Sequence, residues 1–131
     1  PWENYPDRKT SCLIGRWSSK VSSQYTHYPR PQDSGNHEDV TEVTLTNKEG
    51  KGIRVTAIDR PFSFSALYYT VDDIYKATHD CDLKPRKEII LSLDAAVLGL
   101  GNSSCGPGVL KKYAIDKQKP HTLRVRFSLI K

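Results

Sequence analysis

The sequence contains no methionine, only three cysteines and no long apolar run. A membrane-spanning helix needs roughly 20 consecutive apolar residues, so no membrane partner is expected. Cys12, Cys81 and Cys105 are odd in number and lack C-x-x-C spacing, which argues against a structural zinc site and against a disulfide framework. We expect reduced thiols, and we expect the missing initiator methionine to mark an excised or processed piece of a longer protein.

Blocks of like charge are also missing, although the chain is basic overall. The sequence has 20 Lys and Arg against 15 Asp and Glu, a formal net charge of +5. The densest basic positions are Lys84, Arg86, Lys87, Lys111 and Lys112. Lysines that protect a sheet edge from aggregation account for such positions. No nucleic-acid partner is expected, because neither the charge layout nor any motif supports one.

Motifs for metal-dependent or covalent catalysis are absent. The 4 histidines show no H-x-x-x-H or H-E-x-x-H pairing, so no metal site is expected. A glycosidase needs two converging carboxylates, whereas the acidic residues here occur in turn-rich or capping contexts that favour caps and solvated surface. These acidic residues are Glu3, Asp7, Glu38, Asp39, Glu42, Asp72 and Asp73. The sequence therefore predicts no catalytic residue in this chain.

Alternation of apolar and polar residues is the main pattern that is present. Val43 and Leu45, then Ile53, Val55 and Ala57, predict a hairpin closed by turn residues 47–52. The run over 62–66 predicts a third strand of the same antiparallel meander. Further strands are predicted over 88–94 and, most clearly, 121–130.

One short helix is predicted after Thr70, whose hydroxyl can cap a first turn that contains Asp72 and Asp73. One face of it is expected to hold Val71, Ile74, Tyr75 and either Ala77 or Thr78. Two more strands are expected near residues 13–17 and 21–28. Seven or eight short strands with one small helix predict a single all-β domain over residues 1–131, an antiparallel β-sandwich.

The loop that follows the strand over 88–94 is the candidate functional site. Residues 98–109 are rich in glycine, which tolerates left-handed backbone conformations, and in short polar groups. A rigid β scaffold often presents a binding loop in this way. The alternative interpretation is a long turn fixed by Pro107.

A set of short stretches occurs in a characteristic order along nearly the whole chain: Glu3-Asn-Tyr-Pro-Asp-Arg8, residues 25–36, Phe62-Ser-Phe-Ser-Ala66 before residues 70–79, Leu83-Lys-Pro-Arg86, and Leu93-Asp94 before residues 99–107. Together they resemble the C-terminal, small-chain domain of bacterial β-galactosidases of glycoside hydrolase family 2. That domain is a galactose-mutarotase-like supersandwich. The resemblance implies that this chain is its C-terminal half.

For function, the resemblance implies an accessory domain of a retaining β-galactosidase that hydrolyses terminal non-reducing β-D-galactosides such as lactose. The two catalytic glutamates lie in a separate TIM-barrel domain, so the isolated chain is expected to be inactive. The resemblance further implies a homo-oligomeric parent that uses magnesium and sodium ions, in the cytoplasm or periplasm of a bacterium. Its implied partners are the other domains of the parent enzyme and the galactoside substrate.

The resemblance also assigns the candidate loop to the rim of the active site. The implied substrate-binding residues are Gly101, Asn102, Ser103, Ser104 and Cys105. Some relatives place a tryptophan that stacks on the substrate where this chain has Cys105, so the thiol either shapes a sugar subsite or only packs. The loops over residues 3–8 and 25–36 are expected to be ordered by neighbouring domains or subunits.

An alternative function is a stand-alone carbohydrate-binding β-sandwich without chemistry. Aromatic rings suited to stacking on a sugar are available for this role. They include Trp2, Tyr5, Trp17, Tyr25, Tyr28, Tyr68 and Tyr69. Millimolar or tighter binding of galactose or lactose by this chain favours the stand-alone module over the accessory domain.

Overall fold

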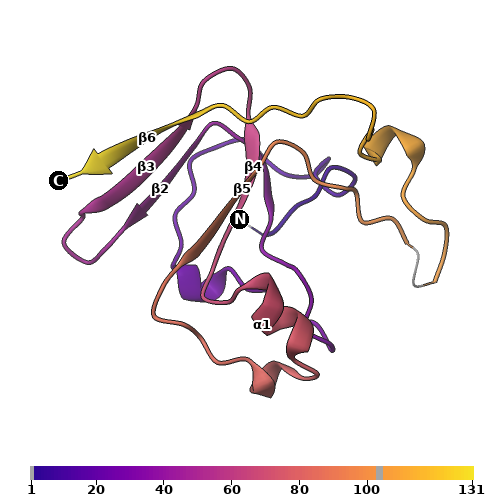
Figure 1. Cartoon of the computed structure of the whole chain (residues 1–131), viewed down its shortest axis with the longest axis horizontal. Coiled ribbons are helices and arrows are strands. Elements are labelled where there is room, and N and C mark those ends of the chain that lie inside the picture. The colour runs from indigo at the N-terminus through magenta and orange to yellow at the C-terminus, as the bar shows by residue number, and fades with distance from the viewer. Residues whose placement is uncertain (1, 103–104) are drawn as a thin grey trace.

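Two three-stranded antiparallel sheets and one short helix make up most of the regular structure in the described part of the chain (Figure 1). This computed structural model describes residues 2–102 and 105–131. One sheet has the order β1 (His37–Val40), β4 (Phe62–Leu67), β5 (Ile90–Asp94), and the other has the order β2 (Glu42–Thr46), β3 (Gly52–Ala57), β6 (Val125–Ile130). The helix is α1 (Val71–Lys76), and 3-10 turns cover Val21–Ser23, Asp80–Asp82 and Lys111–Tyr113. The predicted all-β class with one short helix is confirmed.

The hairpin of β2 and β3 forms where the alternation predicts it. Asn47 organises its turn, because the side-chain Oδ1 accepts hydrogen bonds from the backbone N–H groups of Glu49 at 2.9 Å and Lys51 at 3.0 Å. Gly50 follows with a left-handed φ of 82°. On its other side β3 pairs with β6, from Gly52 opposite Ile130 to Ala57 opposite Val125.

The main core lies where the two sheets meet. Val43 and Val55 come from one sheet and Phe62 from the other, and these side chains are 8%, 0% and 2% exposed. Burying a side chain of this kind stabilises the fold by roughly 1.5–3 kcal/mol. Phe127 and Leu129 continue the same apolar face of β6, yet they are 60% and 79% exposed, although Phe127 lies directly opposite the buried Val55. The predicted alternation along β6 is therefore correct, but only part of its apolar face is buried.

Helix α1 closes a second, smaller core against Tyr25 and Leu67. Its start is a capping box in which the Thr70 hydroxyl accepts from the Asp73 N–H and the Asp73 carboxylate accepts from the Thr70 N–H. Ile74 is the buried helix residue, at 5% exposure. Two other residues of the predicted face, Val71 and Tyr75, are exposed, since six helical residues give one contact with the core.

Three other sequence-based expectations are wrong. β4 does not continue a meander with β3, because residues 58–61 carry the chain across to the other sheet, where β4 lies between β1 and β5. Residues 13–17 form no strand and are exposed, and residues 21–23 form a 3-10 turn. The described residues contain six strands rather than seven or eight.

Candidate functional site

The loop that leaves β5 is held from the N-terminal segment by Asp7. One carboxylate oxygen accepts a hydrogen bond from the Leu100 N–H at 3.0 Å, and the other accepts from the Gly101 N–H at 2.8 Å. The carboxylate thus satisfies two consecutive backbone donors that no strand or helix partner satisfies. Hydrogen bonds to a charged acceptor of this kind are stronger than neutral ones.

Arg8 binds the same loop as a hydrogen-bond donor, whereas Asp7 binds it as an acceptor. Its guanidinium Nη2 donates to the Gly101 carbonyl oxygen at 2.8 Å and to Asn102 Oδ1 at 2.6 Å. Asp7 and Arg8 together therefore bind the backbone on both sides of Gly101. We call these two residues and their four hydrogen bonds to residues 100–102 the loop clamp.

Glycine is required at two positions where the loop passes close to other groups. Gly101 has a φ of 63°, and a Cβ there would lie 2.7 Å from Gly108 C and from Val109 N. A Cβ at the buried Gly99 would lie 2.9 Å from Tyr113 Cβ and 3.0 Å from Asp7 Cγ. The two glycines let the loop fold back on itself and rest against the clamp.

The clamp changes the acidity of Asp7. Burial by itself would raise the pKa of this carboxyl, but the N–H groups of Gly101 and Leu100 stabilise the carboxylate and lower the pKa below its usual 3.8. A lowered pKa means that Asp7 contributes stability above pH 3.8 and that this contribution is lost as the pH falls through the folded-state pKa.

The amide proton of Gly101 is therefore expected to report the ionisation of Asp7. In an acid titration of this chain followed by NMR, its chemical shift should change with a midpoint below the usual pKa of 3.8. Asp7→Asn should abolish the change, and the amide of the remote turn residue Gly50 serves as the control. A midpoint at or above the usual value would contradict the clamp geometry.

The structure places three of the five predicted loop residues. Gly101 and Asn102 lie in the clamp, and Cys105 is exposed, with its N–H donating to the Asn102 carbonyl at 3.0 Å. Ser103 and Ser104 lie outside the described residues. Sequence reasoning missed Asp7 and Arg8 as the supports of this loop. The available signal was an acid and a base side by side in the stretch over residues 3–8.

Contacts within this chain hold the stretch over residues 3–8, for which neighbouring domains or subunits were the expected support. The Glu3 carboxylate accepts hydrogen bonds from the Tyr28 hydroxyl and, at 2.6 Å, from the Gly35 N–H. The same carboxylate accepts from the hydroxyl of Tyr5, whose side chain is buried. The hydrogen bond to Glu3, followed by burial, raises the pKa of Tyr28 to about 12. The segment that presents the clamp is thus anchored in the fold.

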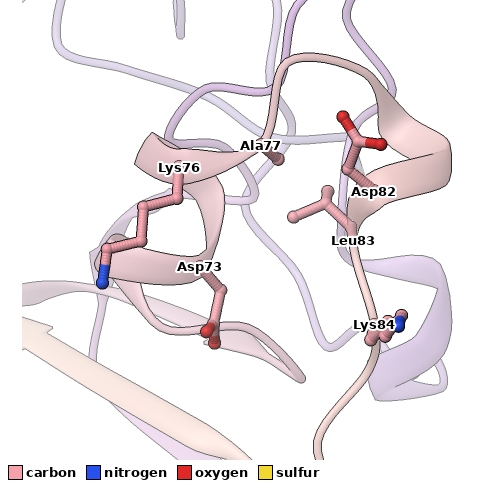
Figure 2. A pocket seen from close by; sticks show the side chains of 6 residues that line it. All are labelled: Asp73, Lys76, Ala77, Asp82, Leu83 and Lys84. Atoms are coloured by element: carbon pink, nitrogen blue, oxygen red, sulfur yellow. The ribbon is translucent and has the colours of Figure 1, made fainter.

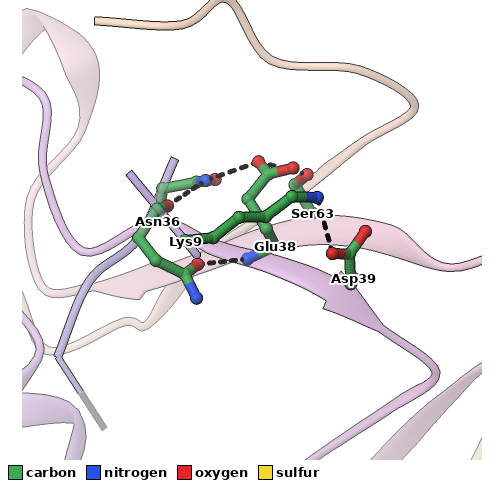
Figure 3. Close-up of polar contacts among 6 residues, drawn as sticks. Lys9, Asn36, Glu38, Asp39 and Ser63 are labelled. Carbon is green, nitrogen blue, oxygen red and sulfur yellow. Dashed lines mark hydrogen bonds and ion pairs between the residues drawn. The ribbon is translucent and has the colours of Figure 1, made fainter. Parts of the chain in front are cut away.

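A second polar cluster lies at the edge of the sheet formed by β1, β4 and β5 (Figure 3). Glu38 Oε1 accepts hydrogen bonds from Asn36 Nδ2 at 2.8 Å and from the Ser63 hydroxyl at 2.7 Å. Lys9 forms an ion pair with Asp39 at 2.5 Å beside this cluster. Each charged group in Figure 3 has a partner within the chain, which is typical of a structural network.

The carboxylates near this cluster do not form a metal site. Burial, followed by the charges of Asp33 and Glu38, raises the pKa of Asp94. In residues 2–102 and 105–131, however, no three His, Cys, Asp or Glu side chains converge in a way that could hold a metal ion. The magnesium and sodium ions that the resemblance implies for the parent enzyme stay a prediction.

A surface pocket of about 290 Å³ lies beside helix α1, and its charged groups also take part in structural contacts (Figure 2). It is lined by Asp73, Lys76, Ala77, Asp82, Leu83 and Lys84. Its two carboxylates are already engaged, because Asp73 binds the Arg86 guanidinium at 2.6 and 2.9 Å and Asp82 caps the N–H groups of Thr78 and His79. These hydrogen bonds lower the pKa of both carboxyls. The pocket therefore offers no unengaged acid for catalysis.

These features define a class of protein: a β-sandwich domain whose distinctive feature is one loop clamped to the N-terminal segment. In the described part of the chain, no helix has the length and apolar character needed to span a bilayer. The family described as "Beta galactosidase small chain" matches residues 1–129. The chain belongs to this β-galactosidase small-chain family.

Individual relatives agree with this family. The chain is 34% identical to the beta-galactosidase of Kluyveromyces lactis over 90% of its own length and 11% of that protein. It is 32% identical to the beta-galactosidase of Arthrobacter sp. strain B7 over 96% of its own length, and 34% identical to beta-galactosidase BgaC of Bifidobacterium adolescentis over 98%. It spans 13% and 12% of those two relatives, so it corresponds to one domain of a much larger enzyme.

Proposed function

We propose that this chain is the C-terminal accessory domain of a retaining β-galactosidase that hydrolyses terminal non-reducing β-D-galactosides such as lactose. In a retaining mechanism one carboxyl group acts as acid and base and the second as nucleophile, roughly 5–5.5 Å apart. We assign both to the remaining domains of the parent, since Glu3, Asp7, Glu38 and Asp73 are engaged in structural hydrogen bonds. Any magnesium or sodium ion of the parent is assigned to those domains as well.

The contribution of this chain to the reaction is the loop that contains Gly101, Asn102 and Cys105. The observation that carries this proposal is the loop clamp, because it fixes a segment without regular secondary structure while Asn102 and Cys105 stay exposed. A fixed loop with exposed polar groups can line the rim of a sugar site that another domain completes. The isolated chain is then inactive, because it has the rim without the acid and the nucleophile.

Substituting Cys105 in the parent enzyme tests the rim role. Cys105→Arg should raise KM for a chromogenic galactoside about tenfold, a loss of about 1.4 kcal/mol in binding, because a long cation would occupy the rim. Melting temperature should change little, since Cys105 is exposed. The matched control is Cys81→Arg, which changes an equally exposed cysteine in the 3-10 turn Asp80–Asp82, outside the loop. Equal KM values for both variants would contradict the proposal.

A further inference from the structure

We propose that Asp7 and Arg8 are positioning residues of the galactoside site, a role that rests on the proposed function of the loop. They contact the loop and not the sugar. Their task is to fix the peptide groups around Gly101 so that the exposed residues Asn102 and Cys105 point to the substrate. The pair comes from a segment 93 positions earlier in the chain, so the site is set by a long-range contact.

The hydrogen-bonding groups of the clamp are complementary to those of the loop. Residues 100–102 present two consecutive N–H donors, then one carbonyl acceptor and one side-chain acceptor, and the clamp meets each with a group of opposite polarity. A single hydrogen bond would let the peptide groups rotate, whereas four bonds around one left-handed glycine define both flanking peptides. The clamp therefore selects one loop conformation.

Core packing does not explain the clamp. The hydrogen bonds of Arg8 to the loop are exposed, and exposed polar pairs contribute about 0–1 kcal/mol to the free energy of unfolding. The clamp also lies outside both hydrophobic cores. Four polar contacts on a loop outside both cores fix the conformation of the loop, beside any stability that they add.

The segment that carries Asp7 and Arg8 is itself held by the fold. The Arg8 N–H donates to the Tyr5 carbonyl at 2.8 Å, and the side chain of Tyr5 is 8% exposed. The Asn4 N–H donates to the Asn36 carbonyl at 2.8 Å, directly before strand β1. The clamp thus fixes the loop relative to a buried, hydrogen-bonded segment. Residues that support a precise site must be anchored in this way.

The experiment compares variants of the parent enzyme by KM, kcat and melting temperature. Asp7→Asn and Arg8→Ala should each raise KM for a chromogenic galactoside about tenfold with a smaller change in kcat. Arg8→Lys should recover part of the loss, since a lysine can still donate to one of the two acceptors. The matched control is Asp73→Asn, because Asp73 also pairs with an arginine and accepts a backbone N–H but has no contact with the loop. It should leave KM unchanged.

Each alternative outcome has a defined meaning. If Cys105→Arg raises KM while the Asp7 and Arg8 variants do not, the positioning role is overturned and the rim function stands. If none of these variants changes KM, both proposals are overturned. If Asp73→Asn raises KM as much as Asp7→Asn, the effect comes from general destabilisation and the positioning role is again overturned. The contacts of Arg8 with the loop are exposed, so its variants are expected to fold and the comparison remains informative.

Discussion

Replacing Phe62 with alanine is expected to lower the free energy of unfolding of this chain by about 3–5 kcal/mol, the usual cost of removing a buried phenylalanine ring. Phe62 is 2% exposed and packs with Val43 and Val55, so its ring joins the two sheets. The space left behind is bordered by strands whose backbones are fixed by pairing, and it can collapse only in part. Such a loss is a large share of the stability of a typical domain.

Urea denaturation followed by circular dichroism measures this effect. The matched control is Phe127→Ala, which removes the same ring from a side chain that is 60% exposed. A surface change of this kind is expected to alter the free energy of unfolding by about 0.5 kcal/mol. Similar losses for the two variants would show that the sheets do not meet at Phe62.

Gly101→Ala is expected to lower the free energy of unfolding by about 2–5 kcal/mol. A left-handed alanine costs about 1–2 kcal/mol, and forcing a methyl group into occupied space costs about 1–3 kcal/mol more. The Cβ would approach Gly108 C and Val109 N at 2.7 Å, and backbone atoms cannot move aside as a flexible side chain can. The same variant should also weaken the clamp, since it displaces the peptide groups that Asp7 and Arg8 bind.

Gly50→Ala provides the matched control for this substitution. Gly50 has a left-handed φ of 82°, but a Cβ added there would meet nothing within 4 Å, so only the conformational cost of about 1–2 kcal/mol applies. Thermal melts of both variants and of the unsubstituted chain give the comparison. If the two alanine variants melt together, the close approach of the loop to residues 108 and 109 is not present.

Local features of the fold were predictable from the sequence, because the residues that decide them are neighbours. Thr70 and Asp73 lie three positions apart and form the expected capping box. The alternation of apolar and polar residues on both sides of a short turn was sufficient to predict the hairpin of β2 and β3. The structure adds its register, in which Val43 lies directly opposite Val55. The resemblance to the small-chain family was likewise confirmed by the match over residues 1–129.

Features that depend on distant contacts were not predictable in this way. Nothing in the local pattern of Phe62 distinguishes a third strand of a meander from the central strand of the opposite sheet. Leu13 and Ile14 are apolar but exposed, so an apolar cluster without alternation was not a strand signal. The partnership of Asp7 with Gly101 spans 94 positions and depends on backbone groups, which carry no sequence signature.

The pairing of β3 has a consequence for the order in which the chain folds. Its contact with β2 closes a short loop, whereas its contact with β6 brings Gly52 to Ile130 across most of the chain. Loop-closure entropy makes such a distant pairing slow compared with a hairpin. During synthesis, the β2–β3 ribbon therefore emerges with the outer edge of β3 still unpaired until residues 125–130 have left the ribosome. In that interval the open edge is the part of the molecule most exposed to aggregation, and a chaperone that covers it would have the greatest effect on yield.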